Sequence, residues 1–388
     1  MQRTHVLPGT PVIGIIGSAG AFGRWFSRFF SEQMRLQVLG YDPQDPQSTC
    51  PEFLAHNADV LLFSVPIRHM SECVRQFASY AQKRQPRQLW IEICSLKHPI
   101  SKYLRCLSVD VLSLHPMCAP PSHSTLFGQG MIVCTVPESG WTPWVNHLLT
   151  QLEARIVRTD YKTHDRVMAI VQSLTHAIHL VQASVLADVL PGLGENIDLQ
   201  AVLSHRSKIF ALDIALVGRI LSSNSAIYED IQFYNPFSLE IMQSMKDSIE
   251  HLYRCVQARD ASARSHFQTH FFERTRHVLG NAVVANANAS FVQIASLHAD
   301  IDALSSVSIL LFQHSLELVL PALCSIFMQF ELRMCGLHTY KDTKGRQCLC
   351  VRLDKQIPVA MRASFEEAVE CLGCAVGESE PYANCSGG

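Results

Sequence analysis

VIGIIGSAGAFGRWF, residues 12–26, is an apolar run followed by a glycine-rich turn and the start of an amphipathic segment. Glycines in such a turn let backbone amides approach a pyrophosphate, and the helix that follows favours its negative charge. The strict Gly-x-Gly-x-x-Gly pattern would need a glycine at position 18, where this chain has serine. The stretch still predicts a strand, turn and helix that bind a dinucleotide. The expected contact residues are Gly17, Ser18, Gly20, Ala21, Phe22 and Gly23.

A second cofactor signal lies 19 residues after Gly23, where the expected strand LQVLGYD ends in Asp42. A carboxylate at this place binds the hydroxyls of the adenine ribose and repels a 2′-phosphate. We therefore expect NAD rather than NADP. The alternative is that residues 17–23 form an ordinary turn between strand and helix and that Asp42 is a turn residue.

The region around this turn alternates short apolar runs with helical stretches. The runs are VIGIIG, LQVLGYD, DVLLFSVP, QLWIEIC, VDVLSLH and GMIVCTV, and amphipathic segments such as AFGRWFSRFFSEQM lie between several of them. Strands that alternate with helices predict a parallel sheet covered on both faces. Residues 1–157 are therefore expected to form an α/β domain of the Rossmann type.

The rest of the chain is expected to form two further domains. Hydrophobic residues recur with a period near 3.6 over 164–190, 208–223, 235–260 and 262–289, which predicts long helices. We expect residues 158–290 to form an all-helical domain, whose excess of apolar surface favours a homodimer. Residues 300–388 predict a small α+β module of strand, helix, two strands around the turn 342–345, and helix, with NCSGG as a flexible tail.

The composition limits the classes of function. Lys and Arg total 32 against 34 Asp and Glu, without a basic stripe, so nucleic acid is not an expected partner. The N-terminus lacks the order of a signal peptide, and the most apolar later run, 307–327, is too polar for a membrane span. The 14 cysteines of this long chain suggest reduced thiols, so we expect a cytoplasmic protein without a membrane segment.

Two cysteine pairs, Cys348-x-Cys350 and Cys371-x-x-Cys374, have spacings that would allow a zinc site if they met in space. The first pair has the spacing of alternate residues on a strand, and the second that of neighbours on an amphipathic helix. We therefore expect small buried side chains here, and no metal.

The strand-like run VDVLSLH ends in His115, which is followed by Pro116. A strand end of this kind faces the cofactor crevice of an α/β sheet. Oxidation of a secondary alcohol with NAD removes a hydride from carbon, while the hydroxyl proton needs an acceptor. His115, on a backbone stiffened by proline, is the candidate acceptor.

Taken together, these motifs resemble those of the prephenate dehydrogenases of tyrosine biosynthesis. The matching pieces are GSAGAFGRWF, SVPI (64–67), EICSLK (92–97), LHPM (114–117), HD-x-x-MA-x-x-Q-x-L-x-H (164–176) and ALVGR (215–219), followed by Tyr228. The resemblance covers residues 12–288. It implies that the chain uses NAD to convert prephenate into 4-hydroxyphenylpyruvate and carbon dioxide.

The resemblance also implies roles for single residues. His115 would hold the substrate hydroxyl, Ser95 would orient the histidine and the nicotinamide, and Arg219 would bind a substrate carboxylate. The other implied contacts are Gln172, His176 and Tyr228 for the substrate and Ser64, Val65 and Pro66 for the cofactor. The alternatives are a surface role for Arg219 and a core role for His176.

Two departures from the family pattern bear on the substrate. Residues 118–120 are Cys-Ala-Pro in place of Phe-Gly-Pro, and Ala211 stands where some members have a second arginine, with only Arg206 nearby. Arogenate, which has an amine in place of the side-chain keto group, or an amino-substituted prephenate, would use much the same residues. His164 and Asp165 are expected to be structural rather than catalytic.

The C-terminal module resembles an ACT domain, in the stretch PALCSIFMQFELRMCGLHTY followed by RQCLCVRLDK. This resemblance implies an effector, with L-tyrosine as the candidate, or a purely dimerising role. Leu318 stands where a glycine commonly opens the first ACT helix. A different class of function also stays open, namely a non-catalytic regulator that senses NAD and an amino acid.

Overall fold

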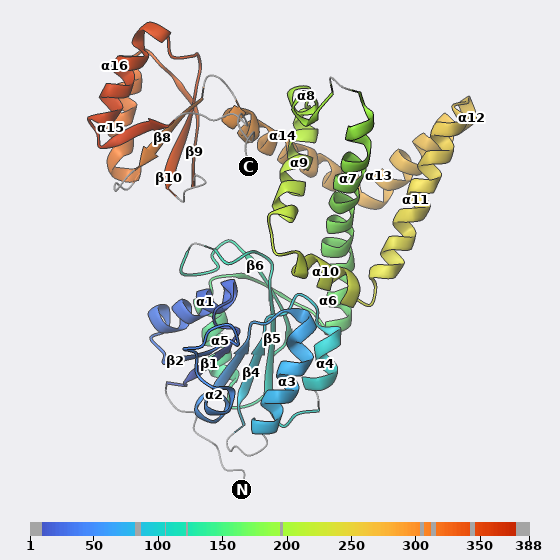
Figure 1. Ribbon diagram of the computed structural model, residues 1–388, viewed down its shortest axis with the longest axis vertical. Coiled ribbons are helices and arrows are strands. Elements are labelled where there is room, and N and C mark those ends of the chain that lie inside the picture. The colour runs from blue at the N-terminus through green and yellow to red at the C-terminus, as the bar shows by residue number, and fades with distance from the viewer. Residues whose placement is uncertain are drawn as a thin grey trace. The chain divides into compact units, whose positions relative to one another are not determined.

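The computed structural model describes residues 10–81, 87–104, 106–121, 123–194, 197–302, 306–311, 316–341 and 346–377. The chain divides into two compact units, one of residues 1–189 with 217–254 and one of residues 190–216 with 255–388 (Figure 1). These units do not coincide with the three expected domains, because helices of the middle region contribute to both. The boundaries 157, 290 and 300 stay predictions.

The first unit contains a seven-stranded sheet in the order β2-β1-β3-β4-β5-β6-β7. Its strands are β1 Ile13–Ile16, β2 Val38–Tyr41, β3 Val60–Phe63, β4 Leu89–Glu92, β5 Asp110–Pro116, β6 Gly130–Thr135 and β7 Arg155–Arg158. The six expected strands are all present, and β7 is additional. Strands β1 to β5 pair in parallel, as the alternation of strands and helices predicts.

The expected parallel sheet contains one antiparallel pairing, toward one edge. Strand β6 pairs antiparallel with β5, and β7 pairs parallel with β6. A parallel pairing needs a crossover connection, usually a helix. The described part of the chain between Pro116 and Gly130 contains no helix, so the chain turns back and β6 runs the opposite way.

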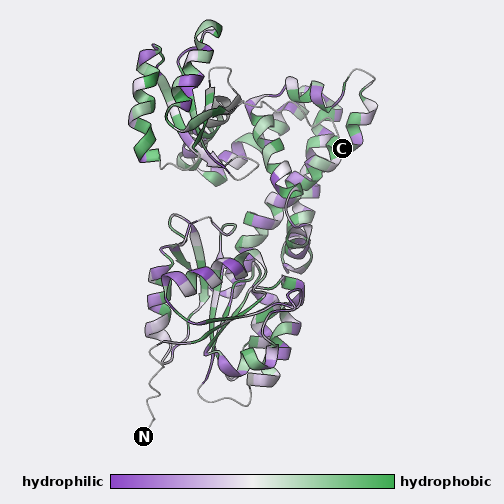
Figure 2. Cartoon of the chain, turned by 60° about the vertical axis from the view of Figure 1, so that its left-hand side comes forward, coloured by the Kyte–Doolittle hydropathy of each residue, from purple (hydrophilic) through white to green (hydrophobic). Residues whose placement is uncertain are grey.

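Helices cover both faces of this sheet. They are α1 Ala21–Arg28, the π-helical η1 Phe29–Gln33, α2 Pro51–Asn57, α3 Ile67–Ala81, α4 His98–Leu104 and α5 Thr142–Gln151. Successive strand residues point to opposite faces, so that Val60 and Leu62 join one buried cluster while Leu61 and Phe63 join another. Figure 2 shows hydrophobic residues on these strands and a mixture of hydrophilic and hydrophobic residues on the surrounding helices.

A long helical rod follows the sheet, formed by α6 Tyr161–Met168, the π-helical η2 Ala169–Leu174 and α7 Thr175–Val189. Asp160 caps its start by accepting from the backbone N–H groups of Lys162 and Thr163. The predicted helix over 164–190 is therefore confirmed, with a π-helical turn that its periodicity did not indicate. Helix α10, Ser225–Tyr234, which was not expected, packs against η2 and α3, and α11 spans Ser238–Ala258.

The second unit begins with the 3₁₀ turn η3 Leu190–Gly192 and α8 Leu199–Ser204, and includes most of α9 Lys208–Leu221. The predicted helix over 262–289 is instead a broken series. It comprises α12 Ala261–Phe267, η4 Gln268–Glu273, α13 Arg274–Leu279 and α14 Asn281–Asp302. The break falls at Gly280, whose φ of 80° ends α13, because glycine adopts this conformation without steric cost.

The C-terminal sheet has the order β11-β8-β10-β9, with antiparallel pairing throughout. Its elements are β8 Ser306–Leu311, α15 Leu316–Gln329, β9 Met334–Lys341, β10 Gln347–Leu353, α16 Val359–Glu370 and β11 Cys374–Gly377. The expected strand–helix–strand–strand–helix order is confirmed and β11 is additional. The expected turn at 342–345 and the tail NCSGG lie outside the described residues.

The spacing of the second cysteine pair predicted that both residues lie on one helix, and this prediction is wrong. Helix α16 ends at Glu370, and Gly373 has a φ of 69°, so the chain reverses and Cys374 begins β11. Cys348 and Cys350 do lie on one strand, β10, and both are buried. Among the described residues, no group of three or more His, Cys, Asp or Glu side chains could hold a metal ion.

Candidate active site

The glycine-rich turn lies at the switch point of the sheet, between β1 and β3, where ligands bind in open α/β folds. Gly17 has a φ of 82°, and a Cβ atom on it would lie 2.2 Å from the carbonyl oxygen of Ser64. A Cβ atom on Gly23 would lie 2.0 Å from the carbonyl oxygen of Gly17. The glycines therefore bring α1 and β3 together as a dinucleotide turn requires, and the N-terminus of α1 opens at this edge.

Asp42 follows β2 at the same edge of the sheet and is 8% exposed. Its carboxylate accepts hydrogen bonds from the backbone N–H of Ala19 at 3.1 Å and of Gln44 at 2.9 Å. These bonds fix the carboxylate beside the glycine-rich turn while each oxygen keeps a second lone pair. The position therefore fits a partner for ribose hydroxyls. Ser64, Val65 and Pro66 follow β3 on the other side of the switch point.

A buried ion pair lies beneath the ends of β4 and β5. Lys97 Nζ contacts both carboxylate oxygens of Glu92, at 2.8 and 2.9 Å, and the carbonyl oxygen of Leu114 at 2.5 Å. Neither side chain is more than 1% exposed. Glu92 also accepts from the Ser113 hydroxyl. The pair ties the loop after β4, which carries Ser95, to the strand that carries the candidate histidine.

His115 lies at the end of β5 and is 2% exposed. Its Nδ1 atom lies 2.9 Å from Nε2 of His164, whose Nδ1 atom lies 2.7 Å from Oδ1 of Asp165. Burial, followed by the charge of Lys97 and the neighbouring His164, holds the pKa of His115 well below its usual value. His115 is therefore neutral at neutral pH and suited to accept a proton.

The sequence predicts a structural role for His164 and Asp165 and none for Glu92 and Lys97 as single residues. The structure places all four in contact with His115 or with its neighbours. Two signals in the sequence could have indicated these residues. One is the charged pair Glu92 and Lys97, five residues apart in an apolar context, and the other is the dipeptide His164-Asp165 near a helix start. What the sequence could not give was that α6 brings His164 under β5.

The helices bring two of the expected substrate residues, His176 and Tyr228, into contact. His176 on α7 packs edge-on against Tyr228 of α10, with ring centroids 4.7 Å apart. Burial and the nearby His179 lower the pKa of His176. Gln232, one turn along α10 from Tyr228, donates its side-chain N–H to the carbonyl oxygen of Ser173 at 2.8 Å.

Several polar atoms in this cluster are buried without a hydrogen-bond partner among the described residues. They are Gln172 Oε1, His176 Nδ1, His179 Nδ1 and Gln232 Oε1. Buried polar atoms are almost always paired, so such a group indicates a place where a polar ligand binds. His179 and Gln232 are not among the site residues expected from the sequence. The π-helical turn η2 carries Gln172, and such turns are frequent at functional sites.

Neither Ser95 nor any of the expected substrate residues makes a described contact with His115. Ser95 is half-buried in the loop between β4 and α4. Arg219 is exposed near the end of α9, and its guanidinium donates to the hydroxyl of Ser223 one turn later. The substrate role of Arg219 therefore stays a prediction.

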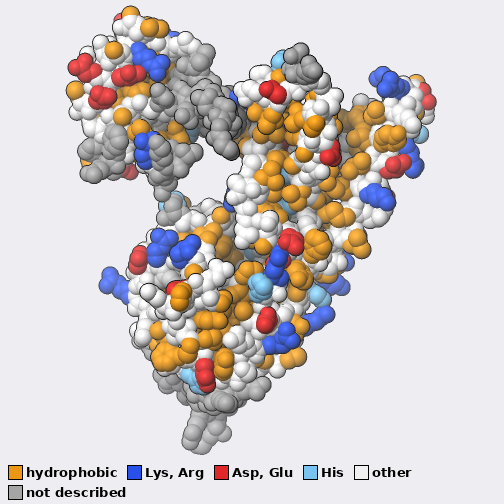
Figure 3. All heavy atoms as spheres, in the orientation of Figure 1, with side chains coloured by type: hydrophobic (Ala, Val, Ile, Leu, Met, Phe, Trp, Pro, Cys, Tyr) orange, Lys and Arg blue, Asp and Glu red, His pale blue; other side chains and the backbone are white. Residues whose placement is uncertain are grey.

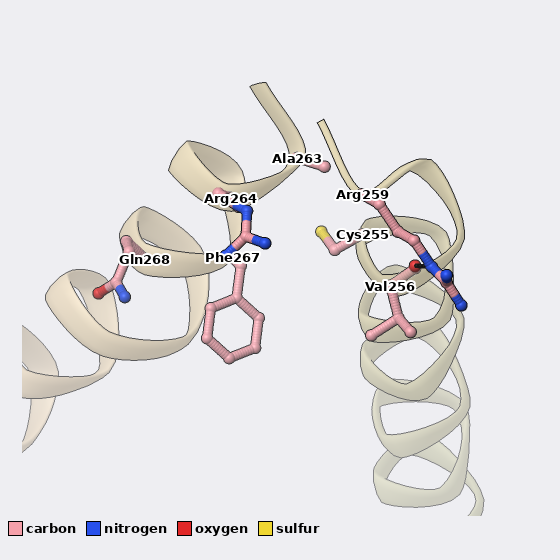
Figure 4. A pocket seen from close by; sticks show the side chains of 7 residues that line it. All are labelled: Cys255, Val256, Arg259, Ala263, Arg264, Phe267 and Gln268. Atoms are coloured by element: carbon pink, nitrogen blue, oxygen red, sulfur yellow. Dashed lines mark hydrogen bonds between the residues drawn. The ribbon is translucent and has the colours of Figure 1, made fainter. Parts of the chain in front are cut away.

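The second unit has a separate cavity of about 560 Å³, where the end of α11 meets α12 and η4 (Figure 4). It is lined by Cys255, Val256, Arg259, Ala263, Arg264, Phe267 and Gln268. None of these residues belongs to the cofactor turn or to the histidine cluster.

Comparison with known proteins matches the helical region to a described family. Residues 160–271 match the model "Prephenate dehydrogenase, dimerization domain". The chain is 26% identical over 312 residues to a "Probable arogenate/prephenate dehydrogenase" of Methanocaldococcus jannaschii, covering 76% of this chain and 67% of that protein. It is 28% identical over 240 residues to the "T-protein" of Enterobacter agglomerans, covering 60% of this chain and 59% of that protein. The chain thus spans roughly two thirds or less of these relatives.

Among solved structures, the fold is similar to that of prephenate dehydrogenase from A. aeolicus, determined with hydroxyphenyl propionate and NAD⁺. The TM-score is 0.53 at 16% identity, over 69% of this chain and 99% of that one. At this identity the likeness concerns the fold, a Rossmann-like α/β domain followed by helices.

Proposed function

We propose that this chain is a member of the prephenate dehydrogenase family and that it is an NAD-dependent dehydrogenase that oxidises prephenate to 4-hydroxyphenylpyruvate with loss of carbon dioxide. The observation that carries the proposal is His115, a neutral buried base at the end of β5, in the same sheet as the dinucleotide turn. A protein that only senses NAD would need no such base.

The residues of the turn fit NAD as the cofactor. The close approaches at Gly17 and Gly23 form the cradle, and Asp42 is fixed where a ribose would bind and a 2′-phosphate would be repelled. When bound, NAD supplies the hydride acceptor. Ser64, Val65 and Pro66 would contact it from β3.

In the proposed reaction, His115 accepts the proton of the substrate hydroxyl as hydride leaves the carbon that bears this hydroxyl. Loss of the ring carboxylate then makes the ring aromatic, so the overall step is effectively irreversible. Ser95 would orient His115 and the nicotinamide, and Arg219 would bind a substrate carboxylate through its guanidinium. Gln172, His176 and Tyr228 would line the pocket around the substrate.

One observation favours a second candidate substrate, arogenate. The buried oxygens Oε1 of Gln172 and Oε1 of Gln232 lack donors among the described residues, and the second is oriented by the bond from Nε2 to Ser173. An ammonium group donates hydrogen bonds, whereas a keto group only accepts them. The amine of arogenate, or of an amino-substituted prephenate, would satisfy these acceptors.

We also propose that the enzyme is a cytoplasmic homodimer. The rod together with η3, residues 161–192, could cross a membrane by length and composition alone. The same holds for two bent helix pairs, 208–234 and 261–295, if each pair is counted as one span. Figure 3 shows hydrophobic side chains gathered over α7, where Ile178, Val181, Val185 and Val189 form an exposed stripe with helical spacing. This rod lies in the matched dimerization domain. Its first turns carry His164 and Asp165, which contact the sheet domain rather than a membrane. We therefore propose that a second copy of the chain covers the exposed stripe.

The C-terminal module is proposed to be an ACT-like regulatory domain with L-tyrosine as effector. Its two helices pack on one four-stranded antiparallel sheet, around Leu323, Phe327 and Phe365. Leu318 is 75% exposed on α15. A bulky side chain at this place would keep a ligand from the helix backbone, so dimerisation is the alternative role.

The test of the proposed function is an assay of the full chain with prephenate and with arogenate, each with NAD and with NADP. We expect NADH and carbon dioxide to form from prephenate with NAD. Turnover of arogenate alone would support the second candidate, and turnover of neither would overturn both.

A further inference from the structure

We propose that His164 and Asp165 are positioning residues that fix the tautomer of His115, leaving its Nε2 atom as the proton acceptor. The inference rests on the proposed function, since the proton it concerns is that of the substrate hydroxyl. It assigns a role to the two residues that the sequence suggested were structural.

The assignment follows from the order of donors and acceptors. A carboxylate only accepts hydrogen bonds, so His164 Nδ1, at 2.7 Å from Asp165 Oδ1, carries a hydrogen. With His164 taken as neutral, its imidazole has one N–H group, so Nε2 of His164 is an acceptor. It lies 2.9 Å from Nδ1 of His115, which therefore donates. With its hydrogen on Nδ1, His115 presents a bare Nε2 atom.

Asp165, the last residue in the hydrogen-bonded series His115–His164–Asp165, is held by several backbone and side-chain groups. Asp165 Oδ1 also accepts from the backbone N–H of Lys97 at 2.8 Å, and Oδ2 accepts from that of His98 at 2.6 Å. The side-chain N–H of Asn235 donates to the carbonyl oxygen of Asp165 at 2.9 Å. Asp165 and His164 are at most 1% exposed. The loop after β4 therefore fixes the carboxylate, and through it the ring of His164, while the segment after α10 holds the backbone of Asp165.

Lys97 disfavours a proton on His115 before the reaction, whereas Asp165 would stabilise the positive charge that forms during it. The groups that face the two histidines are Lys97, Glu92 and Asp165. Lys97 is paired with Glu92, while Asp165 has no cationic side chain within ion-pair distance other than His164 among the described residues. When the substrate O–H bond breaks and an N–H bond forms at Nε2 of His115, the new positive charge is linked through His164 to the carboxylate of Asp165.

The test compares two variants of His164 in the full chain. Glutamine in His164→Gln can accept from His115 Nδ1 through its amide oxygen, whereas leucine in His164→Leu cannot. We expect His164→Leu to lower kcat by roughly a hundredfold with little change in KM, the usual scale for disabling a general base. His164→Gln should recover most of that loss. His147→Gln, on an exposed histidine of α5, is the control and should not change kcat.

A second measurement does not depend on turnover. Nitrogen-15 NMR of the histidine rings should show His115 in the wild type with hydrogen on Nδ1, and a change of this tautomer in His164→Leu. Equal loss of kcat in both variants, or wild-type His115 with hydrogen on Nε2, would overturn the proposal. If the wild type turns over neither prephenate nor arogenate, the proposed function fails, and the NMR result still decides the tautomer. If His164→Leu does not fold, the wild-type tautomer decides.

Discussion

Arg68, at the start of α3, donates through Nε to Oδ1 of Asp230 on α10 at 2.6 Å, and its backbone N–H donates to Oδ2 of the same carboxylate at 3.1 Å. Asp230 is 2% exposed. The pair ties the helix that carries Tyr228 to the segment just after the expected cofactor residues Ser64–Pro66.

Loss of this tie should therefore affect both stability and substrate binding. We expect Asp230→Ala to lower the Tm by several degrees and to raise KM for the substrate, because the Arg68 head group loses its buried partner and α10 is freed. Arg254→Ala is the matched control, since Arg254 pairs with Glu250 at an exposed i, i+4 position. Thermal unfolding and steady-state kinetics check both. An unchanged KM in Asp230→Ala would show that the pair only stabilises the fold.

Replacement of the candidate base should remove turnover and leave cofactor binding. His115→Asn is expected to lower kcat by roughly a hundredfold or more, the scale for loss of a general base. Its affinity for NAD, measured by fluorescence titration, should stay near that of the wild type. Near-normal turnover in this variant would remove His115 from the mechanism.

The pKa of His115 predicts two pH dependences. Because the folded-state pKa lies well below the ordinary value near 6.5, His115 stays neutral in the folded protein as pH falls through 6.5. Activity should therefore persist below pH 6.5. The unfolded chain binds a proton at this residue in that range and the folded chain does not, so this residue's contribution to stability falls as pH falls. Compared with wild type, His115→Asn should lose less Tm between pH 7 and pH 5. Parallel Tm curves would contradict this.

The cofactor turn offers a test of the NAD cradle. Gly17→Ala should abolish measurable NAD binding, because its φ of 82° disfavours a side chain and the new methyl group would meet the Ser64 carbonyl at 2.2 Å. Gly218→Ala is the control. Nothing lies within 4 Å of a Cβ atom at this helical position, and alanine should stabilise the helix by up to about 1 kcal/mol. Isothermal titration with NAD distinguishes the two, and tight binding by Gly17→Ala would refute the cradle.

Asp42 should select NAD. We expect Asp42→Ser to weaken NAD binding by about tenfold and to narrow its advantage over NADP, since charged hydrogen bonds contribute about 1.5–3 kcal/mol and repulsion of a 2′-phosphate is lost. Binding constants for both cofactors measure the effect. A wild type that already prefers NADP would show that the assignment is mistaken.

The sequence by itself determined the local features of this protein. The strand–turn–helix at residues 12–26, the strands β1 to β6 and the rod 161–189 follow from periodicity and glycine placement, which depend on neighbours in the chain. The end of the run VDVLSLH indicated His115, and resemblance to a family then supplied Gln172, His176, Arg219 and Tyr228. Gly280 shows the limit of periodicity, because this single residue with positive φ ends α13 inside the expected helix over 262–289.

Only the tertiary structure decided how distant segments meet. The contact of His115 with His164 joins residues 49 apart, and the bonds of Asp165 to Lys97 and of Arg68 to Asp230 join residues 68 and 162 apart. The reversed direction of β6 is also a long-range result. Such contacts depend on which faces of the sheet and helices pack together, and burial then sets the pKa of His115. A periodic pattern identifies a buried face, but it does not identify the residue that the face meets.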